Sequence, residues 1–350
     1  MRTFGKPSRT FFQKVIFPRL GAKRSQVLVG PKFGVDNAVL DIGNGKVLVT
    51  TTDPLSYIPQ LGPEASAWLS VNLLASDLTT SGLPPQYGIF DFNLPPEMEP
   101  GAFAEYWHAF DGECRKLGIS VVAGHTGRYQ GCNYTVVGGG VLCAVGDGKR
   151  YLLSTMAEVG DDIVLTKGAA VETTAVLTRA FPRTVREALG SELFARAQRY
   201  LTKVTTVKDA IVSASVGIHG RGVTAMHDAT EGGIIAASLE LANASGLGME
   251  LWLDEVPVSE ETQALCRLFR IDPLTSLSEG SLILTSKPYK TDAVLRALNA
   301  AGIRARAVGG MKSRAFGHRG VARNRSFRLK YPDADPYWKA YWQATKKGWK

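Results

Sequence analysis

Residues 46–124 alternate between short runs of β-branched and apolar residues and longer runs with helical spacing, and this alternation constrains the fold more than any other feature. Strand-like runs cover 46–52, 86–94 and 119–124, and we expect the last to be buried. Helix-like runs cover 63–82 and 101–117, with Pro63 suited to a first turn and Gly82 and Gly118 to helix ends. Strands that alternate with helices predict an α/β or α+β class.

The chain is long enough for two domains. It has 350 residues, and a polar turn followed by a new strand near 155–162 indicates a boundary. Before it, residues 134–146 form either a strand pair or one long bent strand; after it, helices at about 170–180 and from about 231 and a strand within 276–286 lead to Gly309-Gly310. We therefore expect domains at 1–158 and 159–311 and treat 312–350 as an appended tail.

Charge is distributed unevenly along the chain. Residues 1–32 hold eight Lys or Arg and no acid, and residues 312–350 hold eleven Lys or Arg and two Asp, whereas 33–311 hold 22 basic and 30 acidic residues. Basic ends can bind phosphates, and central carboxylates can hold a cation. No apolar run approaches the roughly 20 residues of a membrane span, and the four cysteines lack CxxC spacing, so we expect a cytoplasmic protein without a structural zinc site.

The segment MHDATEGGI, residues 226–234, places polar residues and two glycines where a helix should start. Thr230 or Asp228 could cap that helix, and Glu231 suits the positive end of its dipole. The glycines favour a functional interpretation, because a cap does not need them and they cost helix stability. We expect Gly232 and Gly233 to leave backbone N–H groups open to an anion such as phosphate.

Three aspartates lie where strands or helices meet loops: Asp36 in GVDNAVL, Asp53 in TTDPL and Asp77 in ASDLTTSG. Carboxylate oxygens from several loops suit Mg²⁺ bound to nucleotide phosphates. Taken singly, each is also a common turn or cap residue. The chain has neither a GxxxxGK[ST] loop nor a GxGxxG turn after a strand, which argues against the common nucleotide-binding folds.

The order of these motifs resembles a known superfamily. The segments that carry the resemblance are GVDNAVL (34–40), VTTDPL (50–55), VNLLASDLTTSGLPP (71–85), VVAGHT (121–126), VGDDIVLTKG (159–168), MHDATEGGI (226–234) and IDPLTSLSEGSLIL (271–284). They are similar to the ATP-binding group of aminoimidazole ribonucleotide (AIR) synthase, HypE, selenophosphate synthetase and thiamine-monophosphate kinase. The resemblance implies an AIR synthase-like fold, with an α/β N-terminal domain whose strands form a barrel in a homodimer and an α+β C-terminal domain. It also implies ATP and Mg²⁺ in the cleft between them.

The resemblance assigns expected roles to individual residues. It implies metal ligands at Asp36, Asp53 and Asp77, and catalytic or phosphate-facing roles for Asp77, Asp228 and Lys6, the last in a basic N-terminal arm. It implies nucleotide contacts at a second group of residues: Asn72, His125, Thr126, Gly232 and Gly233. Two positions depart from the family pattern, because Val35 replaces an acid, and His125 stands where relatives have Asp or Glu and would hydrogen-bond nucleotide instead.

The later motifs look most like HypE, whereas the terminal cysteine tail of HypE has no counterpart in the sequence, which ends KKGWK. The shared chemistry would be attack of a small-molecule oxygen on the ATP γ-phosphate, and an amide or carboxyl oxygen is the favoured acceptor. Two alternatives stay open: a small-molecule kinase that resembles thiamine-monophosphate kinase, and a non-catalytic ATP-binding or RNA-associated protein.

The tail raises one further expectation. Tyr337, Trp338, Tyr341 and Trp342 fall on one helical face. We expect this face to pack on the second domain of the same chain. RNA binding through the basic tail is the alternative, because Lys and Arg neutralise phosphates and aromatic rings stack on bases.

Overall fold

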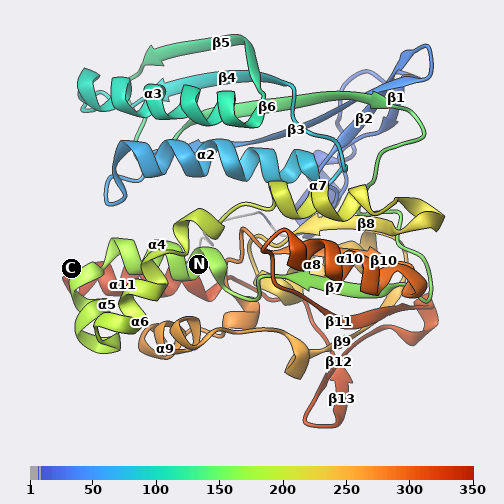
Figure 1. Cartoon of the computed structure of the whole chain (residues 1–350). Helices are drawn as coiled ribbons and strands as arrows, with labels where there is room; N and C mark the ends of the chain where they lie inside the picture. The colour runs from blue at the N-terminus through green and yellow to red at the C-terminus, as the bar shows by residue number, and fades with distance from the viewer. Residues whose placement is uncertain (1–6, 8) are drawn as a thin grey trace.

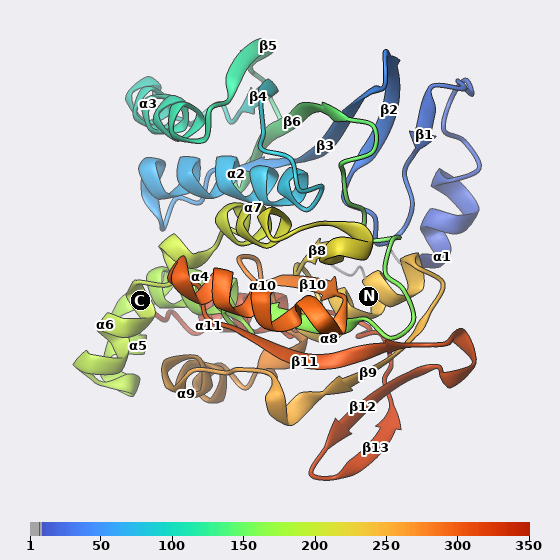
Figure 2. The ribbon, with the colours of Figure 1, turned by 45° about the vertical axis from the view of Figure 1, so that its right-hand side comes forward.

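The computed structural model describes Pro7 and residues 9–350, and it contains two mixed sheets separated by helices (Figures 1 and 2). The first sheet has the order β1-β2-β3-β6-β4-β5, with β4 and β5 parallel and the other pairs antiparallel. Its strands are β1 (Val27–Val29), β2 (Ala38–Gly43), β3 (Lys46–Ser56), β4 (Tyr87–Leu94), β5 (Ser120–Arg128) and β6 (Val136–Asp147). Residues 134–146 thus lie mainly in one long strand rather than a pair.

Two long helices, α2 (Gly62–Thr79) and α3 (Pro100–Leu117), cover one face of this sheet, and α2 lies between the sheet and the second domain (Figure 1). Helix α3 buries Tyr106, Phe110 and Cys114 at four-residue spacing. It ends where predicted, because Gly118 takes the left-handed conformation with φ of 74°. Helix α2 buries residues on most of its surface, as a helix packed from both sides must.

Strand β5 differs from the expectation of a buried strand. It lies at the edge of the first sheet, and the exposed fractions of Val121 and Val122 are 43% and 56%. The described helices leave the outer face of this sheet open in both ribbon views (Figures 1 and 2). Edge strands and apolar sheet faces of this kind are usually covered by another chain.

The second sheet has the order β13-β12-β9-β11-β7-β10-β8. Its strands are β7 (Asp162–Thr166), β8 (Val223–Asp228), β9 (Gly248–Trp252), β10 (Leu282–Ser286), β11 (Ala305–Lys312), β12 (His318–Ala322) and β13 (Arg325–Arg328). Strand β12 pairs in parallel with β9, so the interpretation of 312–350 as an appendage has to be corrected. Residues 318–328 form the edge of the second sheet because they complete hydrogen bonds that β9 would otherwise leave open.

The helices of the second domain surround this sheet (Figure 2). They are α4 (Val171–Ala180), α5 (Pro182–Leu189), α6 (Ser191–Gln198), α7 (Val207–Ser215), α8 (Gly233–Ala244), α9 (Glu260–Phe269), α10 (Pro288–Ala300) and α11 (Pro336–Lys346). A short helix, α1 (Arg9–Phe11), precedes the first domain. None of the described helices is both long and apolar enough to span a membrane.

Helix α11 confirms the expected packing of the tail. It buries Tyr337, Ala340 and Ala344 in a cluster that includes Phe181 of the α4–α5 junction and Phe269 of α9. Trp338 and Tyr341 pack against the same cluster, whereas the exposed fraction of Trp342 is 45%. The aromatic stripe is therefore an intramolecular contact, with Trp342 at its outer margin.

Candidate functional site

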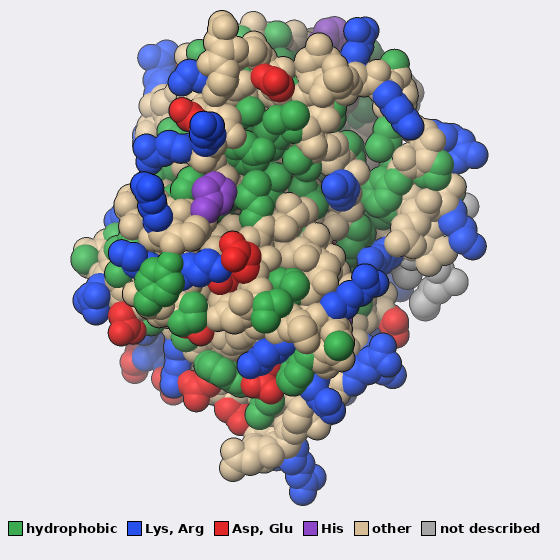
Figure 3. All heavy atoms as spheres, turned by 90° about the vertical axis from the view of Figure 1, so that its right-hand side faces the viewer, with side chains coloured by type: hydrophobic (Ala, Val, Ile, Leu, Met, Phe, Trp, Pro, Cys, Tyr) green, Lys and Arg blue, Asp and Glu red, His purple; other side chains and the backbone are tan. Residues whose placement is uncertain are grey.

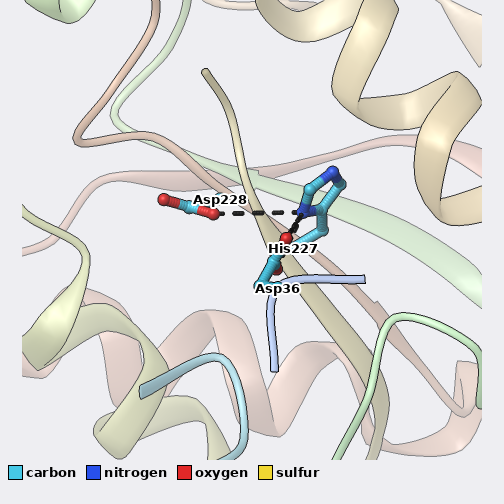
Figure 4. A group of neighbouring side chains, drawn as sticks. All are labelled: Asp36, His227 and Asp228. Atoms are coloured by element: carbon cyan, nitrogen blue, oxygen red, sulfur yellow. Dashed lines mark hydrogen bonds and ion pairs between the residues drawn. The ribbon is translucent and has the colours of Figure 1, made fainter. Parts of the chain in front are cut away.

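His227, near the end of β8, joins the two domains through its contact with Asp36 (Figure 4). Its Nδ1 lies 2.8 Å from the carboxylate of Asp36, which belongs to the loop before β2 of the first domain. Its Nε2 lies 2.8 Å from Oε2 of Glu240 on α8. The exposed fractions of these three side chains are 3%, 9% and 6%, so both contacts are buried.

The two carboxylates decide the charge of His227. Burial alone would lower the pKa of this imidazole, but Asp36 and Glu240 outweigh burial and hold the pKa well above its ordinary value. Both ring nitrogens then carry protons and donate hydrogen bonds. His227 is therefore a fixed cation that orients Asp36.

The contact extends from Glu240 into the C-terminal segment. The hydroxyl of Tyr331 donates to Oε1 of Glu240 over 2.6 Å, so the carboxylate of Glu240 bridges Tyr331 and His227. Burial and Glu240 raise the pKa of Tyr331, which keeps its hydroxyl protonated as a donor. A residue close to the C-terminal end thus supports the histidine that orients Asp36.

Five carboxylates from both domains converge beside this chain of contacts. Burial raises the pKa of Asp77, on the last turn of α2, well above its ordinary value, and four other acids raise it further: Asp228, Asp53, Asp36 and Glu279. Asp53 lies on β3, Asp228 ends β8, and Glu279 lies in the turn before β10. The structure therefore brings together the three predicted metal ligands with the predicted Asp228.

The chemistry of this donor set fits Mg²⁺. Carboxylate oxygens are the ligands that this ion prefers, and buried carboxylates of one sign need a cation to be ionised together. Asp36, His227 and Asp228 present potential ligand atoms within 4.8 Å of one another (Figure 4). Because His227 is engaged at both ring nitrogens, the carboxylates are the groups that would hold the ion.

A buried lysine holds the turn that carries Glu279. Nζ of Lys167 donates to the carbonyl of Gly280 over 2.8 Å and to Oδ2 of Asp209 over the same distance. It also donates to the carbonyl of Thr205. Its charge is therefore used to fix this turn rather than to neutralise the five carboxylates.

The start of α8 requires a correction. The sequence predicted open N–H groups at Gly232 and Gly233 and a cap from Thr230 or Asp228, but the N–H of Gly232 donates to Oδ2 of Asp335 over 2.8 Å. Asp335 lies in the C-terminal segment, and its Oδ1 accepts from the N–H of Tyr337, so one buried carboxylate caps both α8 and α11. The group that accepts a hydrogen bond at this helix start is therefore the carboxylate of Asp335 from the same chain.

The glycine pair has a steric reason that the sequence argument did not consider. Gly232 and Gly233 both have positive φ, 79° and 63°. A Cβ on Gly233 would lie 2.7 Å from the carbonyl oxygen of Ser276 and 2.8 Å from that of Leu274. Only glycine fits such a turn without moving the neighbouring backbone.

The remaining predicted nucleotide ligands lie away from the carboxylates. His125 and Thr126 are exposed on edge strand β5, where Nε2 of His125 lies 2.7 Å from the hydroxyl of Tyr129. Across neighbouring strands Asp53 pairs with Gly140, Gly140 with Phe90, and Phe90 with Gly124. Asp53 and Gly124 are therefore three strand spacings apart, about 14 Å. Within one chain, His125 and Thr126 are therefore not part of the carboxylate site.

Asn72 and Lys6 are the two remaining residues for which the resemblance predicts a role at the site. The amide of Asn72 is buried in α2 and donates to the carbonyl of Trp68 one turn earlier. Lys6 lies outside the described residues. Neither residue is placed at the carboxylates by a described contact.

The sequence analysis assigned no site role to His227, Glu240, Glu279 or Tyr331. Glu240 had a signal, because it is the one charged residue in the apolar run IIAASLELANA that forms α8. Glu279 lay within a quoted motif, without a role. Tyr331 had no local signal, since its contact with Glu240 spans 91 residues.

Comparisons with known proteins identify the family of the chain. Residues 34–145 match the family described as AIR synthase related protein, N-terminal domain, and residues 158–317 match its C-terminal domain. Carbamoyl dehydratase HypE of Bradyrhizobium diazoefficiens is 26% identical over 273 residues, 76% of this chain and 74% of the relative. Thiamine-monophosphate kinase of Aquifex aeolicus is 21% identical over 246 residues, 69% of this chain and 74% of the relative.

Solved structures share the fold. The crystal structure of E. coli HypE superposes with a TM-score of 0.70 and 22% identity, covering 89% of this chain and 94% of HypE. A structure of HypE in complex with ATP superposes with a TM-score of 0.64 and 18% identity, covering 95% of this chain and 97% of HypE. At these identities the likeness concerns the fold.

Proposed function

The chain belongs to the AIR synthase related family, and on that premise we propose that it is an enzyme that uses ATP and Mg²⁺ to phosphorylate or activate an oxygen of a small molecule. The observation that carries the proposal is the convergence of Asp36, Asp53 and Asp77 of the first domain with the buried Asp228 of the second. Such a site needs divalent cations, and a nucleotide polyphosphate is the ligand that commonly accompanies them. The named relatives are a dehydratase and a kinase, and a structure of HypE contains ATP.

Each side chain has a proposed task. Asp36, Asp53 and Asp77 would hold Mg²⁺, which neutralises phosphate charge when bound. His227 donates to Asp36 and orients that carboxylate. Asp228 faces the same space from the second domain and completes the set. Lys6 would add a phosphate contact from the N-terminal arm.

The acceptor that we favour is an amide or carboxyl oxygen, because the later sequence motifs look most like HypE and HypE relatives are named carbamoyl dehydratases. A phosphorylated oxygen of that kind can leave in a second step, which distinguishes activation from simple kinase chemistry. A kinase like thiamine-monophosphate kinase would keep the phosphate on its product. A non-catalytic ATP-binding protein would form neither product.

Calorimetry tests the metal and nucleotide together. We expect ATP to bind weakly in EDTA and at least about tenfold more tightly with Mg²⁺, because the ion bridges phosphates and carboxylates. Asp53→Asn should remove most of this Mg²⁺ dependence, whereas Asp292→Asn on the exposed face of α10 should leave it unchanged. Equal ATP affinity with and without Mg²⁺ would refute the shared-metal interpretation.

Product analysis separates the reaction types. The protein is incubated with Mg-ATP and a metabolite extract, and mass spectrometry identifies new species and the fate of phosphate. Activation predicts a product without phosphate together with ADP and free phosphate, and a kinase predicts a phosphorylated metabolite. An ATP-binding protein that consumes no ATP with any metabolite fraction would be a non-catalytic partner.

We also propose that the first domain forms a homodimer. The outer face of its sheet exposes Tyr87 and Ile89 on β4 beside Val121 on β5, with exposed fractions of 43%, 42% and 43%. Figure 3 shows hydrophobic side chains gathered over the upper half of the molecule, where this domain lies. Light scattering should return twice the chain mass of 37.7 kDa, and Ile89→Lys should shift it towards the monomer. A wild-type monomer at micromolar concentration would refute the dimer.

A further inference from the structure

A cavity lies at the C-terminal end of α8. It has a volume of about 600 Å³ and is lined by α1, the C-terminal end of α8, the turn Arg314–Phe316 and the hairpin β12–β13. Asn243 and Gly246 line it from α8. None of the five carboxylates described above is among the described residues that line this cavity, so its lining is distinct from theirs.

The cavity is strongly basic. Among the residues that the structure describes, four arginines line it, Arg9, Arg314, Arg319 and Arg328, and no carboxylate does. Among the described residues, none of the four arginines forms an ion pair. In the view of Figure 3, Lys and Arg side chains gather on the right-hand part of the molecule, where few acidic side chains accompany them. Unpaired guanidinium groups around a cavity are typical of an anion site.

The hairpin places two of these charges in direct opposition. Arg319 on β12 and Arg328 on β13 are cross-strand partners in the antiparallel register. Like charges at directly opposed positions destabilise a strand pair. Arg319 donates from Nε to the hydroxyl of Ser326, which orients the guanidinium without neutralising it. An anion between the two arginines would remove this repulsion.

A buried nitrogen gives a second indication of a ligand. Nδ1 of His318, at the start of β12, is inaccessible to solvent and has no hydrogen-bond partner among the described residues. Burial lowers the pKa of His318, and Arg328 and Arg9 lower it further, so the ring is neutral and faces both guanidinium groups. A buried polar atom without a partner costs stability, which a hydrogen-bonding ligand would recover.

We propose that this basic cavity binds a small molecule that carries a diphosphate group. Four guanidinium groups match the charge and the several acceptor oxygens of two linked phosphates, and the cavity volume lies in the range of small-molecule sites. Phe316 lines the cavity with an exposed fraction of 38%, and the charged groups of Lys312 and Arg319 lie 5.9 and 6.0 Å from its ring centre. The diphosphate can be free pyrophosphate or part of a nucleotide whose base stacks on Phe316.

The test uses the full chain in EDTA, so that Mg²⁺-dependent binding at the carboxylates does not contribute. Calorimetry with inorganic pyrophosphate should show one site, and Arg314→Gln combined with Arg328→Gln should weaken it at least about tenfold through the loss of charge-assisted hydrogen bonds. The matched control combines Arg323→Gln with Arg325→Gln on the same exposed hairpin, outside the cavity lining, and should stay within about twofold. Asp53→Asn should also leave pyrophosphate binding unchanged, whether or not the proposed ATP reaction is correct.

Two further measurements identify the source of the diphosphate and the role of the arginines. If the ligand is a nucleotide, ADP should bind more tightly than pyrophosphate, and Phe316→Ala should weaken the binding of ADP alone. If ADP binds no more tightly than pyrophosphate and Phe316→Ala changes neither affinity, the ligand is the diphosphate by itself. Without ligand, Arg328→Gln should raise the melting temperature, because it removes the opposed charge, whereas an arginine needed for packing would lower it.

Three results would overturn the proposal. The first is absence of pyrophosphate binding at about 1 mM, which is far weaker than a built site gives. The second is a double variant that binds pyrophosphate as the wild type does. The third is binding of a single-stranded RNA oligomer that pyrophosphate does not displace. If the Arg323→Gln and Arg325→Gln control weakens this RNA binding as much as the cavity variant does, the arginines belong to an open nucleic-acid surface.

Discussion

Replacing His227 tests the electrostatic account of the site. His227→Gln removes the cation between Asp36 and Glu240, two carboxylates that lie on opposite sides of the ring and are each 2.8 Å from a ring nitrogen. Both would then be left without their buried counter-charge. Glutamine has similar size and polarity, so the change is mainly the loss of one positive charge.

The expected cost follows from the burial. The exposed fraction of the His227 side chain is 3%, so the ion pair is buried. Removing one partner of a buried ion pair lowers the free energy of unfolding by about 3–5 kcal/mol. At about 2–4 °C per kcal/mol for a domain of this size, the melting temperature should fall by roughly 6–20 °C. His108→Gln, on the exposed face of α3, is the matched control and should change it little.

The pH dependence of this effect has a defined sign. The pKa of His227 is raised in the folded protein, so its stabilisation is fully present below the unfolded value of 6.5 and is lost as pH rises through the folded pKa. Calorimetric or fluorescence melting of wild type and variant should therefore give the largest difference near about pH 6.5 and a smaller one at alkaline pH.

A second substitution separates charge from shape. Glu240→Gln in the His227→Gln background removes one of the two uncompensated carboxylates and should recover about 1 kcal/mol or more. A single variant that melts like His108→Gln at every pH would refute the buried-cation account. A double variant that recovers nothing would show that His227 stabilises the site by packing.

Two other predictions concern residues near the site. Burial raises the pKa of Glu172, on the first turn of α4, from 4.5 to about 8, and Asp335, Glu231 and Asp53 raise it further. In EDTA, ionisation of Glu172 therefore destabilises the folded protein increasingly as the pH rises from 4.5 to about 8. Glu172→Gln should therefore raise the melting temperature at about pH 9 and change it little at about pH 5; the same gain at both would contradict this origin. Deleting residues 332–350 removes buried Tyr337 and the Asp335 cap, so it should lower the melting temperature by several degrees and leave RNA affinity weak and unchanged. A truncated protein that melts normally and loses a salt-sensitive RNA complex would refute the packing interpretation.

Much of the first domain could be predicted because its signals are local. Pro63 and Gly118 mark a helix start and a helix end through their own backbone preferences, and β3 follows from a run of β-branched residues. The exposure of β5 was not predictable in this way. Its apolar sequence is that of a buried strand, and only the sheet order shows that the strand lies at an edge.

The site was predictable in composition and only partly in geometry. Asp36, Asp53 and Asp77 were expected at metal, and the fold does bring them together. The state of Gly232 was not predictable, because the carboxylate at its N–H comes from Asp335, 103 residues later. Long-range contacts of this kind leave no periodicity in the sequence, since they depend on how the two ends of the second domain meet.

The double cap by Asp335 has a consequence for the order in which the chain is completed during synthesis. The first sheet uses residues 27–147 and can assemble while the second half is still being translated. The start of α8 and the support of Glu240 instead require Asp335 and Tyr331, which are synthesised 103 and 91 residues after Gly232 and Glu240, the residues they contact. A newly made chain therefore passes through a stage in which its carboxylates are present but His227 lacks its full support, and synthesis of the segment that holds Tyr331 and Asp335 ends that stage.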